Sequence, residues 1–420
     1  MEVAFKSLGG RDANQGLILR SLDKLADRLA PTTACTIQIM CFAFTDKIIA
    51  AKLVDLAKTK PALKIEIIAD WSQRSAASAS ILPDLVAANI PNIIVKYKID
   101  FPYRLSRKTG QPEWDYLASC GMLHHKTMLV CVEDQPNFLT FGSYNWSARG
   151  CDAYENTVLL EQNSQTSSVL DSFRAEFLGL WNDPTQTTSP TNATKLASRA
   201  RAMLVAGANL KDPESLNRLL GEFDRPKFDP QKSTLCSEQI IPAFSAKHIL
   251  EEKPTRGAGI ENAHKKIDLI RPNGKRKPAP LTLNTLALEA IRGVPDGEEI
   301  CIAMYAMSPR VPEYECLLEA ARRGCTLKVI LDQTIGGGFA GELAKKAHVE
   351  NLPILVKATH RRMHQKYLLC NATRTVAVGT ANMTRDATFR HFENRVLFQD
   401  MPEISDKFRE DFETIWARIP

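Results

Sequence analysis

The sequence predicts an α/β protein with two pseudo-symmetric halves, each a mixed β-sheet flanked by helices. Three observations lead to this fold class. Apolar, β-rich runs alternate with helical segments, and the same alternation occurs twice along the chain. Each half ends in a helical segment with three evenly spaced aromatic residues, and each carries a His-x-Lys triplet before that end. The repetition indicates an internal duplication rather than two unrelated domains.

Four elements repeat in the same order in both halves. In the first and second half respectively, they are a strand at 35–44 and 299–307, a helix at 47–58 and 313–324, a strand ending in Asp at 63–70 and 326–332, and a further strand at 90–98 and 351–359. Strands that alternate with helices in this way are typical of α/β units.

Three aromatic residues at positions i, i+4 and i+8 mark the closing helix of each half. They are Phe173, Phe177 and Trp181 in the first half, and Phe408, Phe412 and Trp416 in the second. This spacing places the three side chains on one face of a helix, which we expect to pack against the core.

The two copies are separated by a stretch that opens with the small polar run TQTTSPTNAT. We therefore predict an N-terminal half at 1–184, a linker or insert at 185–264 and a C-terminal half at 265–420. The first half also has an insertion at about residues 101–120. The glycine-rich run IGGGFAG at 335–341 is interpreted as a flexible loop.

The composition is that of a globular protein, with 44% hydrophobic and 24% charged residues. No run approaches the roughly 18–20 apolar residues that span a bilayer, and the first residues lack a hydrophobic signal core. The ten cysteines are scattered, without a CxxC pair or a zinc-like Cys/His spacing. We therefore expect a reduced, cytoplasmic protein with no transmembrane segment, no metal site and no cofactor. The net charge of +6 is a weak indication of an anionic partner.

The last third of each half carries one ordered motif: His-x-Lys, a β-hairpin, Gly-Ser/Thr-x-Asn-x-Ser/Thr, and a Glu-Asn pair leading into another strand. A single His-x-Lys triplet is common, but two complete copies at equivalent places are not explained by chance. The residues are His124, Lys126, Gly142, Asn145, Ser147 and Glu155 in the first half, and His364, Lys366, Gly379, Asn382, Thr384 and Glu393 in the second.

Strand geometry gives the spacing within this motif a meaning. Residues two apart on a β-strand point to the same face, about 7 Å from each other. His124 and Lys126 therefore project together, as do His364 and Lys366, whereas His125 points to the opposite face. The hairpin then returns the chain so that the Asn of the motif can join the His-Lys pair.

These residue types suit attack on a phosphodiester. A neutral imidazole can attack phosphorus without being repelled by the phosphate oxygens, which gives a covalent phosphohistidine. Lysine and asparagine then stabilise charge on the phosphate oxygens. A second histidine can protonate the leaving oxygen and later activate water, and a glutamate on the far ring nitrogen fixes the tautomer. Two histidines with opposite roles require two copies of the motif.

With these motifs the chain resembles the phospholipase D superfamily, whose hallmark is the paired HKD motif. The resemblance covers both halves but not the middle segment. It implies one active site at the interface of two pseudo-symmetric halves, where the His-Lys-Asn sets face each other with Glu155 and Glu393 behind the histidines. It also implies that His124 is the nucleophile and His364 the general acid, with no metal. The Asp of the HKD motif is replaced in both copies.

The resemblance determines the reaction type better than the substrate. The segments GSYNWS and ENTVLL look closest to the endonuclease-like branch, so we predict a nuclease that binds DNA or RNA. Basic residues near the motifs would contact phosphates; they are Arg361, Arg362, RLSRK at 104–108 and GKRK at 274–277. The predicted substrate-binding residues are Ser147, Thr384, Arg361 and Arg362.

Two alternatives remain beside the nuclease. Anionic phospholipid headgroups would favour the same basic residues, so a phospholipase D or phosphatidyltransferase acting on lipid is the second hypothesis. A non-catalytic binding protein that keeps the fold is the third, and the two intact His-Lys-Asn sets argue against it. The sequence leaves open the oligomeric state and the choice between hydrolysis and transfer.

Overall fold

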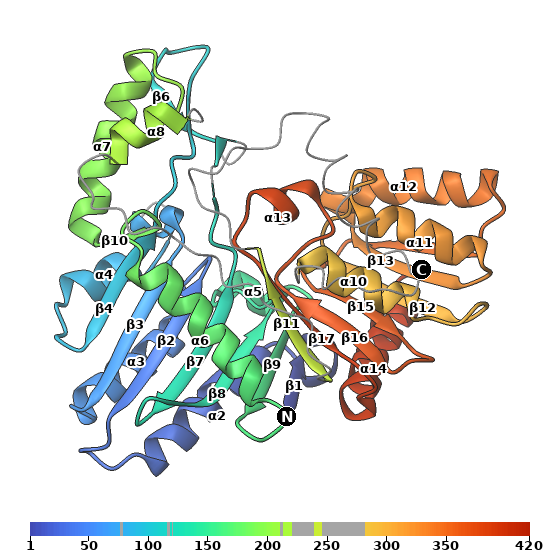
Figure 1. Ribbon diagram of the computed structural model, residues 1–420, viewed down its shortest axis with the longest axis horizontal. Helices are drawn as coiled ribbons and strands as arrows, with labels where there is room; N and C mark the ends of the chain where they lie inside the picture. Colours follow the sequence, from blue (N-terminus) through green and yellow to red (C-terminus); the bar gives the residue numbers. More distant parts are fainter. Residues whose placement is uncertain (76–78, 116–117, 120, 211–212, 221–238, 246–281) are drawn as a thin grey trace, which may run out of the picture.

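The computed structural model describes residues 1–75, 79–115, 118–119, 121–210, 213–220, 239–245 and 282–420, and the statements below concern these residues. Two large mixed sheets lie side by side with helices on their faces (Figure 1). This arrangement confirms the predicted α/β class and the two pseudo-symmetric halves.

The first half forms an eight-stranded sheet in the order β1-β9-β8-β7-β2-β3-β4-β10. Its strands are β1 Glu2–Phe5, β2 Cys35–Cys41, β3 Leu63–Ala69, β4 Ile93–Lys98, β7 Lys126–Val132, β8 Gln135–Gly142, β9 Asn156–Glu161 and β10 Thr187–Thr188. The second half forms a seven-stranded sheet in the order β11-β17-β16-β15-β12-β13-β14. Its strands are β11 Ile240–Phe244, β12 Glu299–Met304, β13 Thr326–Asp332, β14 Ile354–Thr359, β15 Lys366–Cys370, β16 Thr375–Gly379 and β17 Asn394–Phe398.

The two strand orders are equivalent apart from β10. In each sheet the predicted strands pair in parallel, β2-β3-β4 in the first half and β12-β13-β14 in the second. The motif-bearing strands β7-β8-β9 and β15-β16-β17 are antiparallel. The duplication seen in the sequence is therefore a duplication of topology.

Helices cover both sheets. In the first half they are α1 Lys6–Gly9, α2 Ala13–Arg28, α3 Lys47–Thr59, α4 Leu82–Ala87, α5 Ala148–Asp152, α6 Ser167–Asn182, α7 Pro190–Val205 and α8 Pro213–Leu220, with a 3-10 turn at Trp71–Arg74. In the second half they are α10 Leu283–Arg292, α11 Pro312–Arg322, α12 Gln333–Val349, α13 Arg385–Phe389 and α14 Pro402–Arg418. In the part of the chain that the structure describes, no helix has the length and apolarity needed to cross a bilayer.

The glycine-rich run at 335–341 is part of helix α12, so the prediction of a flexible loop was wrong. Asp332 caps this helix, because its Oδ1 accepts hydrogen bonds from two backbone N–H groups in the first turn. Gly336 lies close to the sheet, and an added Cβ would be 3.0 Å from the Cβ of Leu331. The glycine therefore permits close packing of helix on strand and does not mark a loop.

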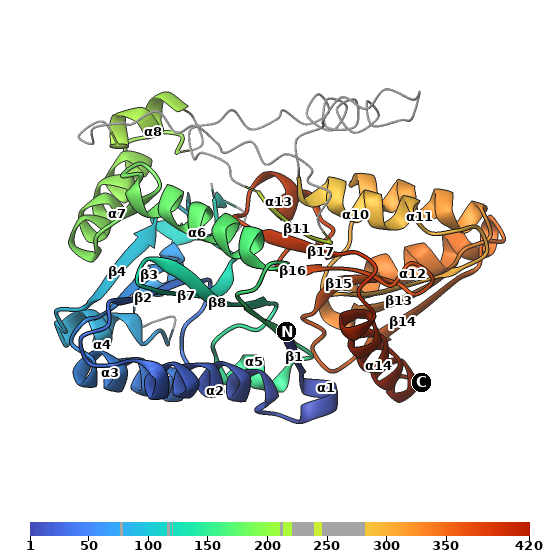
Figure 2. The same cartoon turned by 60° about the horizontal axis from the view of Figure 1, so that its bottom comes forward.

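The closing helices join the two halves (Figure 2). Helix α6 packs on β8 of its own sheet and on β11 of the second sheet, while α14 packs on β16 and on β1 of the first sheet. As predicted, their phenylalanines are buried, and each tryptophan stacks on the phenylalanine one turn before it. These helices therefore bind the sheets together as well as closing each half.

One apolar core continues from the first sheet into the second. It includes Phe141 and Val158 from the first half and Val376 and Phe398 from the second. The rings of Phe141 and Phe398 are nearly parallel, with centroids 6.5 Å apart. Because burying this apolar surface is favourable, it holds the halves together at the interface where the histidines lie.

The insertion and part of the predicted linker form an arm at the top left of Figure 1, made of α7, α8 and a hairpin of β5 Tyr103–Leu105 and β6 Pro112–Trp114. Within the predicted linker, β10 pairs with β4 of the first sheet, and β11 pairs with β17 of the second sheet. The division into 1–184, 185–264 and 265–420 remains a prediction; residues 240–244, which it assigns to the linker, form β11 of the second sheet.

Candidate active site

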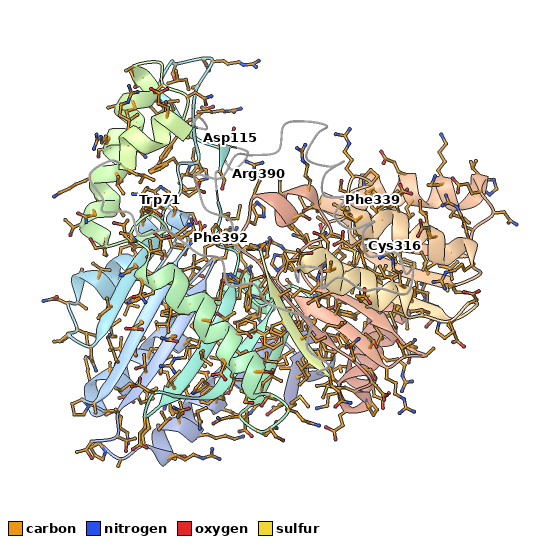
Figure 3. The ribbon with its side chains drawn as sticks, viewed as in Figure 1. Trp71, Asp115, Cys316, Phe339, Arg390 and Phe392 are labelled. Atoms are coloured by element: carbon orange, nitrogen blue, oxygen red, sulfur yellow. The ribbon has the colours of Figure 1, made fainter. Side chains whose placement is uncertain are left out.

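The two histidine-bearing segments meet at the interface of the halves. The backbone N–H of His124 donates to the carbonyl of Phe392 at 2.9 Å, and that of His364 donates to the carbonyl of Tyr154 at 3.0 Å. A short parallel β-bridge extends each contact. Phe392 lies where the second half reaches the first (Figure 3). Each histidine is thus held by the segment that precedes the Glu-Asn pair of the other half.

The imidazole rings of His124 and His364 are close, with centroids 6.3 Å apart and planes at 74°. Nδ1 of His124 lies 2.9 Å from Oε2 of Glu393, and Nδ1 of His364 lies 2.8 Å from Oε1 of Glu155. The first contact has hydrogen-bond geometry, and the second is as short but not aligned as a hydrogen bond. Each histidine is therefore paired with the glutamate of the opposite half, which leaves Nε2 of both rings for chemistry.

Lys126 and Lys366 are buried beside the histidines of their own halves. Nζ of Lys126 donates to the carbonyl of His124 at 2.6 Å, and Nζ of Lys366 donates to the carbonyl of His364. Burial lowers the pKa of Lys126 to about 8 and that of Lys366 to about 7, against the attraction of the two buried glutamates. A bound anion would favour the charged form of both lysines.

Burial keeps both imidazoles neutral in the resting site. It lowers the pKa of His124 to about 3 and that of His364 well below 6.5, and the two lysine cations act in the same direction. The glutamates differ from each other. Burial raises the pKa of Glu155 to about 8, whereas for Glu393 the opposing effect of His124 and His391 outweighs burial and lowers the pKa. A neutral imidazole beside an ionised carboxylate is suited to nucleophilic attack.

Two aromatic residues that the motif did not include flank the histidines. The ring centroid of Phe42 is 5.1 Å from that of His124, and the centroid of Tyr305 is 4.9 Å from that of His364. The lysine ammonium groups lie over the same aromatic rings, at 5.2 Å for Phe42 and 5.1 Å for Tyr305. Phe42 directly follows β2 and Tyr305 directly follows the equivalent strand β12. This equivalence in the sequence is the signal that could have identified them.

Two aspartates at equivalent strand ends, Asp70 directly after β3 and Asp332 at the end of β13, position the histidine segments. Oδ2 of Asp70 accepts from the backbone N–H of Leu123 at 2.9 Å, and Oδ2 of Asp332 accepts from that of Met363 at 3.0 Å. Oδ1 of each aspartate caps the helical turn that follows its strand. One buried side chain thus ties the strand end, the helix start and the residue before the histidine together. The sequence showed strands ending in Asp without indicating this role.

The glycines of the motif lie beside the asparagine of the Glu-Asn pair in the same half. An added Cβ on Gly142 or Gly379 would overlap the carbonyl of the asparagine in that pair. The side-chain oxygens of Asn145 and Asn382 are buried and make no hydrogen bond within the described residues. Binding of phosphate by these two amides remains a prediction.

His125 points away from the paired histidines, on the face that strand alternation predicts. Its Nδ1 lies 2.8 Å from Nδ2 of Asn394, and its Nε2 lies 3.4 Å from Oε1 of Glu176. His125 therefore contacts β17 of the second half and helix α6, and not the imidazole of His364.

A family model described as cardiolipin synthase, PLD-like domain, matches residues 28–181 and, a second time, residues 296–416. The two matches coincide with the two sheets that carry the histidines. The chain belongs to the phospholipase D superfamily. It is thus a phosphodiesterase of that superfamily.

Among the solved structures similar to this chain, a phosphatidylserine synthase shares its fold. Phosphatidylserine synthase from Haemophilus influenzae is 8% identical with a TM-score of 0.57, over 100% of this chain and 87% of the synthase. Nuc from Salmonella typhimurium is 20% identical with a TM-score of 0.30, over 43% of this chain and 95% of Nuc. Yeast tyrosyl-DNA phosphodiesterase is 11% identical with a TM-score of 0.39, over 88% and 85% of the two chains. No curated protein sequence matches the chain significantly.

Two positions depart from the phospholipase D motif. Cys131, in place of the first Asp, is buried in β7. Asn371, in place of the second, donates to Oε1 of Glu299 at 2.9 Å. Both lie five residues beyond the motif lysine, about 17 Å along an extended strand. At that distance from the histidines, their contacts are those of the sheet.

The predicted substrate-binding residues have local contacts of their own. The hydroxyl oxygens of Ser147 and Thr384 cap helices α5 and α13, accepting from backbone N–H groups at 3.0 and 3.4 Å. Arg361 and Arg362 are exposed, and Nε of Arg361 donates to the carbonyl of Asp152 at 3.2 Å. Substrate binding by these four residues remains a prediction, and GKRK at 274–277 lies outside the described residues.

The described residues contain no group of three or more His, Cys, Asp or Glu side chains that is arranged to hold a metal ion.

Proposed function

We propose that this phospholipase D superfamily protein is a nuclease that hydrolyses DNA or RNA through a covalent phosphohistidine, without a metal ion. The pair of imidazoles with centroids 6.3 Å apart, each with Nδ1 against a buried carboxylate, carries the proposal. A phosphorus atom between the two Nε2 atoms would have a nucleophile on one side and a proton donor on the other. In-line displacement requires this arrangement.

In the first step, Nε2 of His124 attacks phosphorus. The N–P bond forms while the P–O bond to the leaving group breaks, and the leaving oxygen takes a proton from Nε2 of His364. The His124 ring becomes cationic, and Glu393 at Nδ1 stabilises it. Lys126 and Lys366 donate to the non-bridging oxygens.

The bound phosphodiester also prepares His364 for this step. Burial and the two lysines lower the pKa of His364 in the free site. The negative phosphate opposes the lysine charges and favours the protonated ring. Substrate binding therefore favours uptake of a proton from solvent by His364, and the protonated ring is the general acid.

In the second step, His364 is neutral and takes a proton from a water molecule. The water oxygen attacks phosphorus while the N–P bond to His124 breaks, and His124 returns to its neutral form. The products are a phosphate monoester end and a free hydroxyl. Each histidine ends the cycle in the protonation state in which it began.

Exposed basic residues favour nucleic acid as the substrate. Arg361 and Arg362 immediately precede the second motif and lie at the surface. Along a polynucleotide, such residues contact the phosphates that flank the scissile one. A phosphatidylcholine or phosphatidylglycerol molecule carries a single phosphate and offers no flanking phosphate in the same molecule. Cleavage of lipid is therefore the alternative outcome that the parallel vesicle assay distinguishes.

The test is cleavage of plasmid, single-stranded DNA and RNA by the purified protein in EDTA, with phosphatidylcholine and phosphatidylglycerol vesicles assayed in parallel. We expect strand cleavage and a labelled covalent adduct on a denaturing gel. His124→Ala should abolish the adduct. His364→Ala should still form it from a substrate with a p-nitrophenyl leaving group, which needs no general acid, but should not hydrolyse it.

The matched control is His125→Gln, because Gln365 stands at the equivalent place in the second half and His125 faces away from the site. This variant should keep its activity. Headgroup release from vesicles without cleavage of any nucleic acid would overturn the proposed substrate. A wild-type protein that cleaves phosphodiesters without a trappable adduct would overturn the phosphohistidine.

A further inference from the structure

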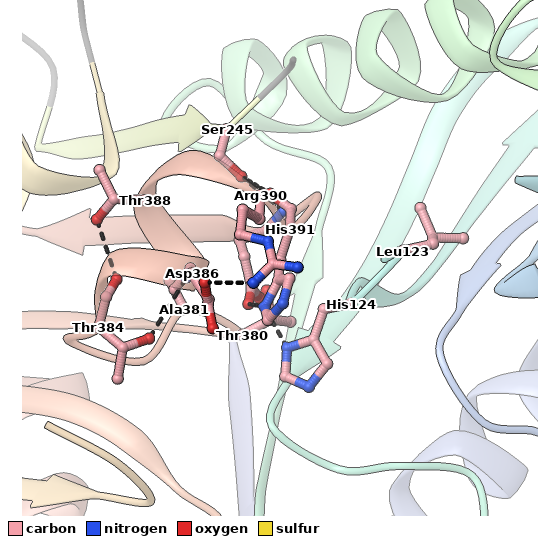
Figure 4. Close-up of polar contacts among 12 residues, drawn as sticks. Leu123, His124, Ser245, Thr380, Ala381, Thr384, Asp386, Thr388, Arg390 and His391 are labelled. Carbon is pink, nitrogen blue, oxygen red and sulfur yellow. Dashed lines mark hydrogen bonds and ion pairs between the residues drawn. The ribbon is translucent and has the colours of Figure 1, made fainter. Parts of the chain in front are cut away.

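The duplicated site is asymmetric beside its glutamates. His391 stands two residues before Glu393, whereas Ala153 stands two residues before Glu155. Figure 4 shows His391 next to His124, with Ser245 nearby. The repeated motif does not include His391, because it has no counterpart in the first half.

His391 lies against the oxygen of Glu393 that His124 does not use. Its Nδ1 is 3.6 Å from Oε1, while Oε2 is hydrogen-bonded to His124. The ring centroids of His391 and His124 are 6.1 Å apart. Oε1 is buried and makes no hydrogen bond within the described residues. Because an unsatisfied buried carboxylate oxygen is costly, a small rotation of His391 toward it is favourable.

The backbone around His391 is held on both sides. Oγ of Ser245 donates to the carbonyl of His391 at 2.6 Å and accepts from the N–H of Glu393 at 2.8 Å. The N–H of His391 donates to the carbonyl of Asp386 at 3.0 Å. At the place of Ser245, the first half has Lys6, whose side chain bonds elsewhere. The backbone of His391 is therefore fixed, and this keeps its ring near the carboxylate of Glu393.

We propose that His391 is a positioning residue that keeps Glu393 ionised and directed at His124, and so makes His124 the histidine that carries the phosphoryl group. This inference rests on the proposed phosphohistidine mechanism. His124 gains a positive charge when the N–P bond forms, and an ionised carboxylate at Nδ1 stabilises it. Glu155 has no second histidine, and its contact with His364 is not aligned as a hydrogen bond.

The other charged groups around the site do not explain this asymmetry. Those acting on Glu393 or Glu155 from the surrounding segments are His124, His364, Lys126, Lys366 and Arg362. The histidines and lysines are present in both copies of the motif. Arg362 faces Glu155, but it is exposed, so water and salt screen its charge. His391 is the additional neighbour that distinguishes Glu393 from Glu155.

The test compares His391→Ala and His391→Gln with His360→Ala, which removes an exposed histidine outside the site. The substrate is bis-(p-nitrophenyl) phosphate, whose cleavage does not depend on the choice between nucleic acid and lipid. In His391→Ala we expect kcat to fall about tenfold, the size of effect typical of outer-shell partners, with KM unchanged. The acid limb of the kcat profile should move to higher pH, because Glu393 loses a neighbour that lowers its pKa.

His391→Gln should recover most of the lost kcat, because its amide can donate to Oε1, and His360→Ala should match the wild type. Peptide mapping of the trapped adduct should place it on His124. An unchanged kcat and pH profile in His391→Ala, or an adduct on His364 in the wild type, would overturn the inference.

Failure of the proposed function gives a different result, namely a wild-type protein that cleaves no phosphodiester at all. In that case, histidine ring ¹⁵N spectra of the resting protein test the contact between His391 and Glu393. Glu393→Gln should shift the ring signals of both His391 and His124 but not those of His360. If the His391 signal does not shift, the contact with Glu393 is refuted.

Discussion

Nδ1 of His124 lies 2.9 Å from Oε2 of Glu393, although 269 residues separate them in the chain. The reciprocal contact joins His364 to Glu155 at 2.8 Å. Neither half contains both members of either of these two pairs, so the site forms only when the halves pack together. The continuous apolar core fixes this interface, which a preorganised site requires.

Removal of the charge at Glu393 should impair the chemistry of a histidine in the other half. Glu393→Gln keeps the shape of the side chain but cannot stabilise a cationic His124 ring. We expect kcat for phosphodiester cleavage to fall on the order of 10²-fold or more, by analogy with removal of the orienting carboxylate in hydrolase triads. Rapid-quench measurement of adduct formation checks this, because the effect should appear in the first step.

The control for this substitution is Glu176→Gln. Glu176 also lies beside a buried histidine, at 3.4 Å from Nε2 of His125, but on the face away from the site. It should leave the rate of adduct formation within about twofold of the wild type, since it removes no group that acts on His124. Equal losses in both variants would mean that the rate reports general disturbance of the interface.

The buried lysines predict an alkaline limit on activity. Burial lowers the pKa of Lys126 to about 8 and that of Lys366 to about 7. The protonated forms bind the phosphate, so both charges are present below pH 7 and are lost as pH rises through 7 and 8. We expect kcat/KM to fall over this range, by up to about tenfold per pH unit for each lysine that deprotonates. In the complex the anion raises both pKa values, so kcat should fall only at higher pH.

Steady-state profiles of kcat/KM and kcat between pH 6 and 10 measure the alkaline limit in the free site and in the complex, respectively. Thermal denaturation at the same pH values separates loss of charge from loss of fold. A kcat/KM that stays level from pH 6.5 to 9 would show that neither lysine loses its proton in the free site.

The sequence was sufficient for the fold because the duplication repeats local patterns. The strand alternation, the closing aromatics and the His-x-Lys spacing each occur within a short segment, and each is seen twice. Strand alternation likewise separates His124 from His125, which contacts Glu176 in the structure. Such features depend on neighbours in the chain, and sequence patterns record them directly.

The crossed pairing of glutamates and histidines depends on contacts between halves. Both copies carry the same motif, so the sequence is compatible with either pairing, and only the packed interface distinguishes them. His391 was not predicted for a related reason, since a residue present in one copy is invisible to a comparison of copies. The glycine run of α12 was misread because Gly336 serves a close contact with Leu331, which no local pattern reports.

The strand-end aspartates should be needed for catalysis beyond their role as helix caps. Asp70 accepts from two backbone N–H groups and Asp332 from three. Asp70→Asn and Asp332→Asn each keep only one acceptor oxygen, so either the helical turn or the N–H before the histidine loses its partner. We expect a loss of about 1–3 kcal/mol in the free energy of unfolding. We also expect a tenfold or larger fall in kcat, because a misplaced nucleophile is inefficient.

Ser189→Ala serves as the comparison, since Ser189 caps α7 in the arm without touching a histidine segment. Urea unfolding and kcat are measured for all three variants. Ser189→Ala should lose stability, about 1 kcal/mol for a lost cap, and keep its kcat. If the aspartate variants also keep theirs, the aspartates stabilise the fold without positioning the histidines.

Two glycines that look alike in the sequence should respond in opposite ways to alanine. At Gly379, an added Cβ would overlap the carbonyl of Asn394 and lie 2.9 Å from the Cα of Arg395, both backbone atoms of a central strand. Gly379→Ala should therefore lower the free energy of unfolding by about 1–3 kcal/mol or more. At Gly338, inside α12, the added Cβ would meet nothing within 4 Å. Gly338→Ala should raise it by about 0.5–1 kcal/mol, because alanine loses less conformational entropy in a helix. Urea unfolding of the two variants checks both signs, and a destabilised Gly338→Ala would contradict the assignment of residues 335–341 to a helix.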